Sequence, residues 1–230
     1  MKQSKLKIAI ILLIVQSAFF FSACNWNKTQ RGAAVGTGVG AAAGAAIGSK
    51  SNHTIMGAII GAAVGGTTGA LIGNYMDKQA EELQRDLQGA KVERVGEGIK
   101  ITFNSGLLFD VDSYTLSSAS QTNLTDLAKT LNKYDDTNIL IEGHTDDTGS
   151  DEHNMSLSEK RANAVSVFLK SNAIVGGRIS TDGYGEKQPV SENTSEAGRQ
   201  QNRRVDVAIF ANKKLKKAAE KGEIGSLNTK

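Results

Sequence analysis

The sequence predicts an α+β fold with a mixed β-sheet covered by helices, preceded by a helical hairpin. Two patterns carry this prediction. After Gly98, apolar residues switch between the two-residue period of strands and the period of helices, in the order β-α-β-α-β-β. Before it, glycines recur at every fourth position in two runs between residues 32 and 73. The composition is that of a globular chain, because 39% hydrophobic and 22% charged residues fit neither a polytopic membrane protein nor a wholly disordered one.

Residues 1–23 have the pattern of a signal peptide, with a basic start and an apolar stretch too short to span a bilayer comfortably. The motif Phe21-Ser22-Ala23-Cys24 resembles a bacterial lipobox, which implies that Cys24 carries acyl chains such as palmitate and becomes the mature N-terminus. Residues 24–31 then form a lipid-anchor linker, and Asn25 favours the outer membrane because Asp commonly retains lipoproteins in the inner one. An ordinary signal peptide that leaves a free cysteine and an uncleaved anchor helix are the alternatives.

Residues 32–73 predict a glycine-zipper helical hairpin. Glycine destabilises a water-exposed helix, so ten glycines at a strict four-residue spacing need a compensating close contact in an apolar medium. We expect the hairpin to enter or lie in the membrane, where its glycine stripe also allows a homo-oligomer; the alternative is a flexible spacer. The two arms are Gly32, Gly36, Gly40, Gly44 and Gly48, and Gly57, Gly61, Gly65, Gly69 and Gly73.

The segments that flank the C-terminal domain are predicted to be helical. Apolar residues at helical spacing predict an amphipathic connecting helix over residues 74–95. Residues 211–230 form a basic tail, which we interpret as a solvated helix rather than a contact with an anionic surface. Residues 95–210 carry a net charge of −6, and the chain without its leader is neutral, so no positive field favours nucleic acid as a partner.

Residues 96–210 contain the signals of the α+β domain. Ile99, Ile101 and Phe103 alternate with polar residues in a first strand, and a helix follows. A second strand ends at Gly143-His144-Thr145-Asp146 and precedes a second helix. The remaining elements are the first helix with its face at Leu124, Leu127, Ala128 and Leu131, the second helix with its face at Leu157, Val165, Phe168 and Leu169, a strand near residues 178–185, and a strand at Val205, Val207 and Ile209.

Arg161 interrupts the apolar face of the second helix, since it lies four residues after Leu157 and four before Val165. A cation in that position needs a partner, and Asp146 at the end of the preceding strand is a candidate. Loops at strand ends are common places for ligands in α/β sheets. The pattern alone leaves a ligand site and a structural Arg–Asp bridge equally open.

The stretch Asn154-Met155-Ser156-Leu157-Ser158-Glu159-Lys160-Arg161-Ala162 resembles the signature of the OmpA-like peptidoglycan-binding domain. Four further blocks resemble the same family in the same order, and together they cover residues 96–210. These blocks are Phe109-Asp110, residues 143–149, Gly183-Tyr184-Gly185 and residues 198–205.

The resemblance implies non-covalent binding of the peptidoglycan stem peptide. The two principal ligand residues of the family fall on Asp146, which would bind the ammonium of meso-diaminopimelate, and on Arg161, which would bind its carboxylate. It also implies Thr145 and Asn154 as polar contacts, Leu157 as a packing wall, Arg203 as a second cation, and a less defined role for Asp112.

An enzyme is the competing interpretation, with His144, Asp146, Asp151 and His153 as ligands of a catalytic zinc. No His-Glu-x-x-His motif or third neutral ligand supports it, so we predict no catalytic residue, metal or cofactor. The predicted function is an outer-membrane lipoprotein whose periplasmic domain tethers the envelope to the cell wall. The alternative is a membrane-active glycine-zipper oligomer that a wall-binding domain merely positions.

Overall fold

The structure is a computed structural model that describes residues 54–110 and 112–224. The predicted signal peptide (1–23), Cys24 with its linker (24–31) and the first glycine arm (32–48) lie outside the described residues. These three assignments therefore stay predictions.

A five-stranded mixed sheet forms the centre of the molecule, in the order β1-β2-β5-β3-β4. Neighbouring strands are antiparallel except β3 and β4, which are parallel, so the predicted α+β fold with a mixed sheet is confirmed. The strands are β1 (Ala90–Val95), β2 (Gly98–Asn104), β3 (Thr137–His144), β4 (Ile179–Gly183) and β5 (Arg204–Ala211).

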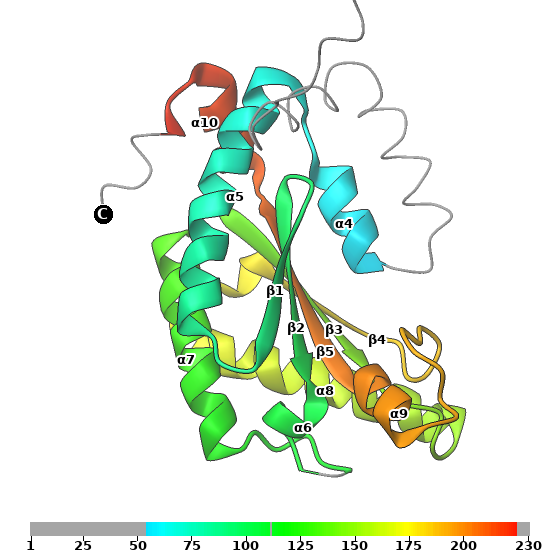
Figure 1. Cartoon of the computed structure of the whole chain (residues 1–230). Helices are drawn as coiled ribbons and strands as arrows, with labels where there is room; N and C mark the ends of the chain where they lie inside the picture. The colour runs from blue at the N-terminus through cyan, green and yellow to red at the C-terminus, as the bar shows by residue number, and fades with distance from the viewer. Residues whose placement is uncertain (1–53, 111, 225–230) are drawn as a thin grey trace, which may run out of the picture.

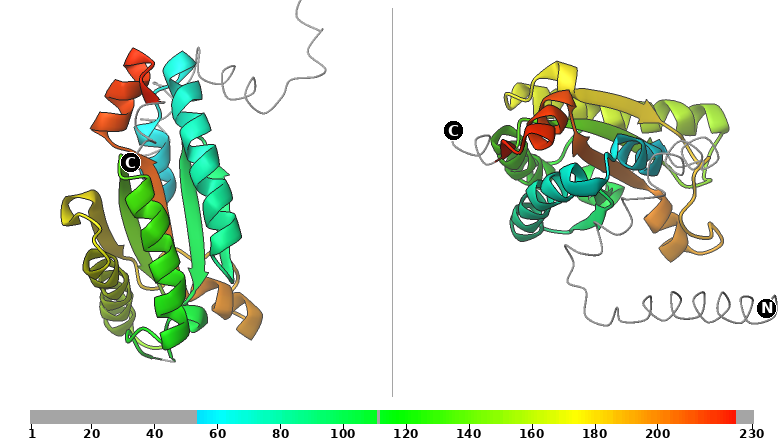
Figure 2. Two further views of the ribbon diagram at one scale, coloured as in Figure 1. Left: turned by 90° about the vertical axis from the view of Figure 1, so that its left-hand side faces the viewer. Right: turned by 90° about the horizontal axis from the view of Figure 1, so that it is seen from above.

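Helices lie on both sides of this sheet (Figures 1 and 2). In Figure 1, α4 (Thr54–Ala62) lies in front of the sheet and α8 (Asp151–Ser171) lies behind it. The other helices are α5 (Gly66–Asp86), α6 (Ser105–Leu108), α7 (Ser118–Lys133), the 3-10 turn η2 (Gly176–Arg178), α9 (Glu196–Asn202) and α10 (Lys213–Lys221).

The main core lies between the sheet and the helices α5, α7 and α8. Because successive strand residues point to opposite faces, one face of the sheet contributes a uniform set of apolar side chains to it. That set is Ile99, Ile101, Phe103, Ile139, Ile141, Val205, Val207 and Ile209. The opposite face is more polar and carries Lys100, Thr102, Glu142 and Asp206.

The predicted connecting helix over residues 74–95 is wrong at its C-terminal end. Helix α5 stops at Asp86, because Leu87 adopts extended backbone and Gly89 has a φ of 73°. Residues Ala90–Val95 instead form the edge strand β1, which pairs with β2 across a tight turn. The pairing partner satisfies backbone groups that a longer helix would have satisfied internally.

The second glycine arm is also not one helix. It is divided between α4 and α5 by three residues, 63–65, and both Gly65 and Gly66 have positive φ. Helix α5 already belongs to the domain, since Ile72 and Met76 are fully buried in the main core.

The basic tail is helical over Lys213–Lys221, as predicted, but this helix is not solvated on all sides. Helix α10 buries Leu215, Ala218 and Ala219, and it packs against α5. The folded unit therefore extends beyond the predicted boundaries of 96 and 210 at both ends.

Candidate functional site

Two glycines allow α8 to lie close to the parallel strands β3 and β4. Gly143 and Gly183 are partners in the β3–β4 register. A Cβ atom on Gly143 would lie 2.1 Å from the Ser158 carbonyl oxygen, and one on Gly183 would lie 2.6 Å from the Glu159 backbone nitrogen. Only glycine permits this approach, which places the N-terminal half of α8 beside the carboxyl ends of the two strands.

The start of α8 is fixed by the loop that follows β3. The Ser150 hydroxyl accepts a hydrogen bond from the His153 N–H (3.2 Å), and Asp151 and Glu152 occupy the first turn. Both features stabilise a helix N-terminus. The Thr145 N–H donates to the Gly185 carbonyl oxygen (2.9 Å), so the short loop between β3 and α8, which carries Asp146, is held at both ends.

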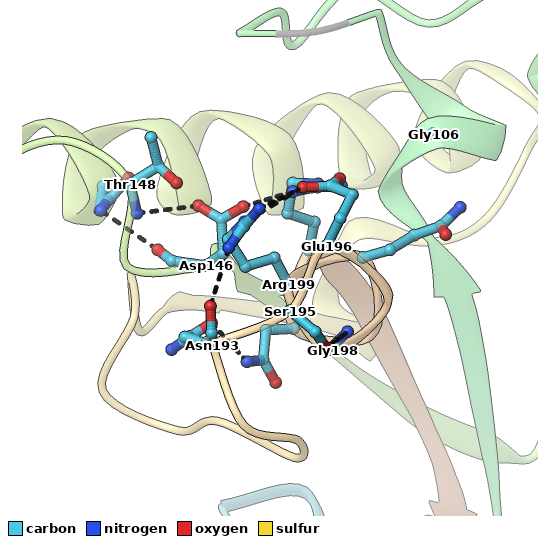
Figure 3. Close-up of polar contacts among 12 residues, drawn as sticks. Gly106, Asp146, Thr148, Asn193, Ser195, Glu196, Gly198 and Arg199 are labelled. Atoms are coloured by element: carbon cyan, nitrogen blue, oxygen red, sulfur yellow. Dashed lines mark hydrogen bonds and ion pairs between the residues drawn. The ribbon is translucent and has the colours of Figure 1, made fainter.

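Asp146 is a buried carboxylate held by two donors. It is 4% exposed, and its Oδ1 accepts the Thr148 backbone N–H (2.9 Å). Its Oδ2 accepts the guanidinium of Arg203, which also pairs with Glu196. Figure 3 shows Asp146, Thr148 and Glu196 gathered beside the loop that carries Asn193.

These contacts keep Asp146 ionised. Burial alone would raise the pKa of its carboxyl, but the hydrogen bonds from Thr148 and Arg203 outweigh burial and lower the pKa. At neutral pH Asp146 is therefore ionised and paired with Arg203.

Arg161 lies on α8 as a buried cation, 3% exposed. Its Nε donates to the Ser113 carbonyl oxygen (2.9 Å), and its guanidinium carbon lies 5.3 Å from the centre of the Phe109 ring. Burial lowers the pKa of Arg161, while the charges of Asp112 and Asp146 raise it. An arginine starts so far above neutral pH that it stays charged.

The structure does not contain the Arg161–Asp146 bridge that the sequence left open. Among the described residues, no hydrogen bond or ion pair joins the two side chains, and Asp146 pairs with Arg203 instead. The charges of the site nevertheless act on one another. Asp146 raises the pKa of Arg161, and Arg203 lowers it. The site thus holds a carboxylate and a guanidinium that do not neutralise each other by direct contact.

Thr145 precedes Asp146 in the chain, and Asn154 contacts the Asp146 backbone from α8. The buried Thr145 hydroxyl has no hydrogen-bond partner among the described residues. The Asn154 amide donates to the Asp146 backbone carbonyl (3.3 Å) and to Glu186 Oε2 (2.6 Å). Leu157 is half-buried on the same helix, α8.

Asp112 lies at the outer edge of the site. It is exposed, has a φ of 51°, and pairs with His153 at 2.8 Å. Its charge acts on Arg161, but its side chain contacts α8 through His153.

The sequence reasoning missed four groups that hold the site together. The Thr148 N–H could have been predicted, because an Asp often accepts from the backbone two residues on. The Ser113 carbonyl, Glu186 and Glu196 gave no signal, because they reach the site only through the fold.

The histidines proposed as zinc ligands do not converge. His144 is buried in the sheet and stacks on the Tyr184 ring at 5.6 Å, whereas His153 lies at the surface on Asp112. Within residues 54–110 and 112–224, no group of three or more His, Cys, Asp or Glu side chains could hold a metal ion. In the same part of the chain, no helix is both long enough and apolar enough to cross a membrane.

Fold and site together define an α+β domain in which the buried side chains of Asp146 and Arg161 lie near the carboxyl end of a parallel strand pair. Comparison with protein families gives the class a name. Residues 108–203 match the OmpA family, and residues 1–77 match the YMGG-like Gly-zipper family. The chain belongs to the OmpA family.

Individual relatives agree with this assignment. The chain is 35% identical to "Probable lipoprotein YiaD" of Escherichia coli over 137 residues. This matched stretch covers 59% of the chain and 63% of that protein. It is 36% identical over 121 residues to the "Peptidoglycan-associated lipoprotein" of Mesorhizobium japonicum, covering 52% and 72%. The match thus spans less than two thirds of the Escherichia coli protein.

A solved structure shares the fold. The cell wall anchor of the T6SS from Pseudomonas aeruginosa superposes with a TM-score of 0.53 and 27% sequence identity, over 60% of this chain and 97% of that chain.

Proposed function

We propose that this chain is an outer-membrane lipoprotein that binds the peptidoglycan stem peptide non-covalently and tethers the envelope to the cell wall. The observation that carries the proposal is the pair of buried charges, Asp146 after β3 and Arg161 on the adjacent α8, which are not bonded to each other. The names of two similar proteins, a peptidoglycan-associated lipoprotein and a cell wall anchor, support it.

The chemistry of the site fits meso-diaminopimelate. The side-chain end of this amino acid exposes an ammonium and a carboxylate on one carbon, so a receptor needs an anion and a cation in fixed positions. Asp146 would accept the ammonium with the lone pairs that Thr148 and Arg203 leave, and Arg161 would donate its terminal nitrogens to the carboxylate. Lysine in the same position of a stem peptide lacks the carboxylate.

Neighbouring groups would complete the contacts. The Thr145 hydroxyl and the Asn154 amide lie beside Asp146 as further polar partners, and Leu157 supplies an apolar wall. An open depression of about 740 Å³ is lined by Asp147, the residue after Asp146, and by residues 189–194, and it would offer room for the rest of the peptide.

We assign the site to binding rather than catalysis. A general acid or base works best with a pKa near the working pH, and Asp146 has its pKa moved away from neutrality. The other charged residue of the site, Arg161, cannot give up its proton in this range.

The membrane end of the proposed tether is the lipidated Cys24 with the glycine zipper. The match of residues 1–77 to a Gly-zipper family and the lipoprotein names of two relatives support this assignment. Two or more acyl chains suffice for stable anchoring, which leaves the domain free in the periplasm.

Co-sedimentation of the full chain, in mild detergent, with insoluble diaminopimelate-type sacculi tests the proposal. We expect the parent to sediment, and Asp146→Asn and Arg161→Gln to bind at least about tenfold more weakly, a change of roughly 1.4 kcal/mol. The matched controls, Asp151→Asn and Lys170→Gln, remove the same charges from exposed positions on α8 and should bind like the parent. A parent that stays in the supernatant would refute the tether.

A deletion within the glycine zipper tests the alternative function, a membrane-active glycine-zipper oligomer. Because α5 begins at Gly66 and is part of the core, the deletion that separates the two functions must end before α4. Removing residues 32–53 and keeping Cys24 should leave sacculus binding intact and the tether working. Loss of the cellular function, with sacculus binding intact, would favour the oligomer.

A further inference from the structure

Helix α4 covers part of the polar face of the sheet, opposite the main core (Figures 1 and 2). Ile55 (2% exposed) and Ile59 (0% exposed) pack on Leu140 and Ala208 in a small apolar cluster of their own. These two sheet residues lie on the face that α7 and α8 do not cover. The C-terminal half of the glycine zipper therefore begins with a segment that is docked on the domain.

Residues 63–65, the elbow between α4 and α5, are held by a single carboxylate. Glu97, in the β1–β2 turn, accepts the Val64 N–H at Oε2 and the Gly65 N–H at Oε1, both at 2.8 Å. These are amides that a continuous helix would pair internally, so the carboxylate replaces helical hydrogen bonds at the break.

Two zipper glycines, Gly65 and Gly69, and two further glycines, Gly66 and Gly98, fit this docked arrangement closely. Gly65 and Gly66 have φ values of 73° and 65°, which favour glycine. A Cβ on Gly69 would lie 2.2 Å from Glu97 Oε1. On the sheet side, a Cβ on Gly98 would lie 2.6 Å from Ile59 Cγ2.

The docked segment is apolar and has a buried cluster separate from the main core. Four buried residues make up this cluster, and Ala58, Val95 and Phe210 pack against it. The surrounding sheet face is polar, and its Glu142 carboxylate accepts the Ile55 backbone N–H. Residues 54–73 contain no charged side chain. With the elbow amides released from Glu97, the same residues can form one helix, as their unbroken four-residue glycine spacing predicts.

We propose that the polar face of the sheet is a reversible docking surface for residues 54–62, that Glu97 is its clasp, and that the segment leaves it to bury its apolar side chains in a lipid bilayer. The docking part of this inference rests on the contacts described above. The transfer of the segment to a bilayer rests on the proposed membrane attachment. It does not depend on peptidoglycan binding.

The clasp can be tested without altering the segment itself, because Glu97 belongs to the domain. The variant is Glu97→Gln, with Glu93→Gln as the matched control on the neighbouring strand, where the carboxylate pairs with Lys91. Leu140→Ala is a second variant, since it weakens the apolar floor under α4 from the sheet side.

The full chain is reconstituted in vesicles of phosphatidylethanolamine and phosphatidylglycerol that contain a lipid with a photoreactive acyl chain. Glu97→Gln and Leu140→Ala should increase acyl-chain cross-linking of residues 54–66 severalfold over the parent. In the same samples, amide hydrogen exchange at Val64 and Gly65 should accelerate in Glu97→Gln, while exchange in α7 and α8 stays unchanged. Glu93→Gln should match the parent in both measurements.

Unchanged exchange at the elbow would overturn the clasp. Faster exchange without added lipid cross-linking would overturn the lipid destination, and with it the proposal. Sacculus binding by Glu97→Gln should equal that of the parent, so a failure of the tether and a failure of this inference give different results.

Discussion

At the scale of single residues, the site is organised by charges that are fixed before a ligand arrives. Asp146 is held by Thr148 and Arg203, and Arg161 by Ser113 and the Phe109 ring. A ligand with both charges replaces water without requiring either side chain to move far, which reduces the entropy lost on binding.

The second face of the sheet has its own buried acid, Glu142. Burial, with smaller effects from Asp206 and Asp182, raises its pKa to about 7, although the Ile55 backbone N–H and Arg204 act in the opposite direction. The folded chain therefore holds a proton that the unfolded chain loses nearer pH 4.5. The free energy of unfolding should fall as pH rises from about 5 to 7, by roughly 1–3 kcal/mol from this group.

Glu142→Gln should remove this part of the pH dependence and make the variant more stable than the parent at pH 8. Urea denaturation of both chains at pH 5 and pH 8 measures the difference. If the variant and the parent lose the same stability between the two pH values, Glu142 does not carry a proton in the folded state.

The sequence pattern singles out Arg161 and Asp146 because each belongs to a local motif, and their role as ligand contacts stays a prediction that the family resemblance implies. Arg161 interrupts an apolar helix face, and Asp146 ends a strand pattern. Their partners could not be predicted in the same way, because Ser113 and Glu196 are brought to the site from distant segments. The pairing of Asp146 with Arg203 joins residues 57 positions apart.

At the scale of elements, the position of α8 on the strand pair β3–β4 decides the geometry of the site. Gly143→Ala adds a Cβ that would lie 2.1 Å from the Ser158 carbonyl oxygen, so α8 must shift. We expect a loss of about 1–3 kcal/mol in the free energy of unfolding, and weaker sacculus binding because Asn154 and Arg161 move with the helix.

Gly177→Ala is the matched control, since nothing lies within 4 Å of its added Cβ. It should change stability by no more than about 0.5 kcal/mol. Equal stability of the two alanine variants in urea denaturation would contradict the close approach of α8.

The elements that sequence analysis predicted well have strong periodicity and local ends. The strands around Ile101, Ile139 and Val207 and the helices α7 and α8 are of this kind. Strand β1 was missed because its conformation depends on pairing with β2. The break between α4 and α5 depends on Glu97, which lies 32 residues after Gly65.

At the scale of the whole molecule, segments from both ends of the described chain complete the core. Helix α10 contributes Leu215, which is fully buried, and packs on α5. Leu215→Ala should lower the free energy of unfolding by about 2–4 kcal/mol. The matched control is Lys217→Ala, at an exposed position of the same helix, and it should leave the free energy of unfolding nearly unchanged. Urea denaturation measures both variants. If Leu215→Ala is as stable as the parent, α10 does not contribute to the core.

The central claim is that Asp146 and Arg161 together recognise a zwitterion. Titration of the full chain, in detergent, with two stem tripeptides that differ only in ending with meso-diaminopimelate or with lysine, followed by calorimetry, tests it directly. We expect the diaminopimelate peptide to bind at least about tenfold more tightly than the lysine peptide, and Arg161→Gln to abolish this preference. Equal affinity of the parent for both peptides would contradict the claim.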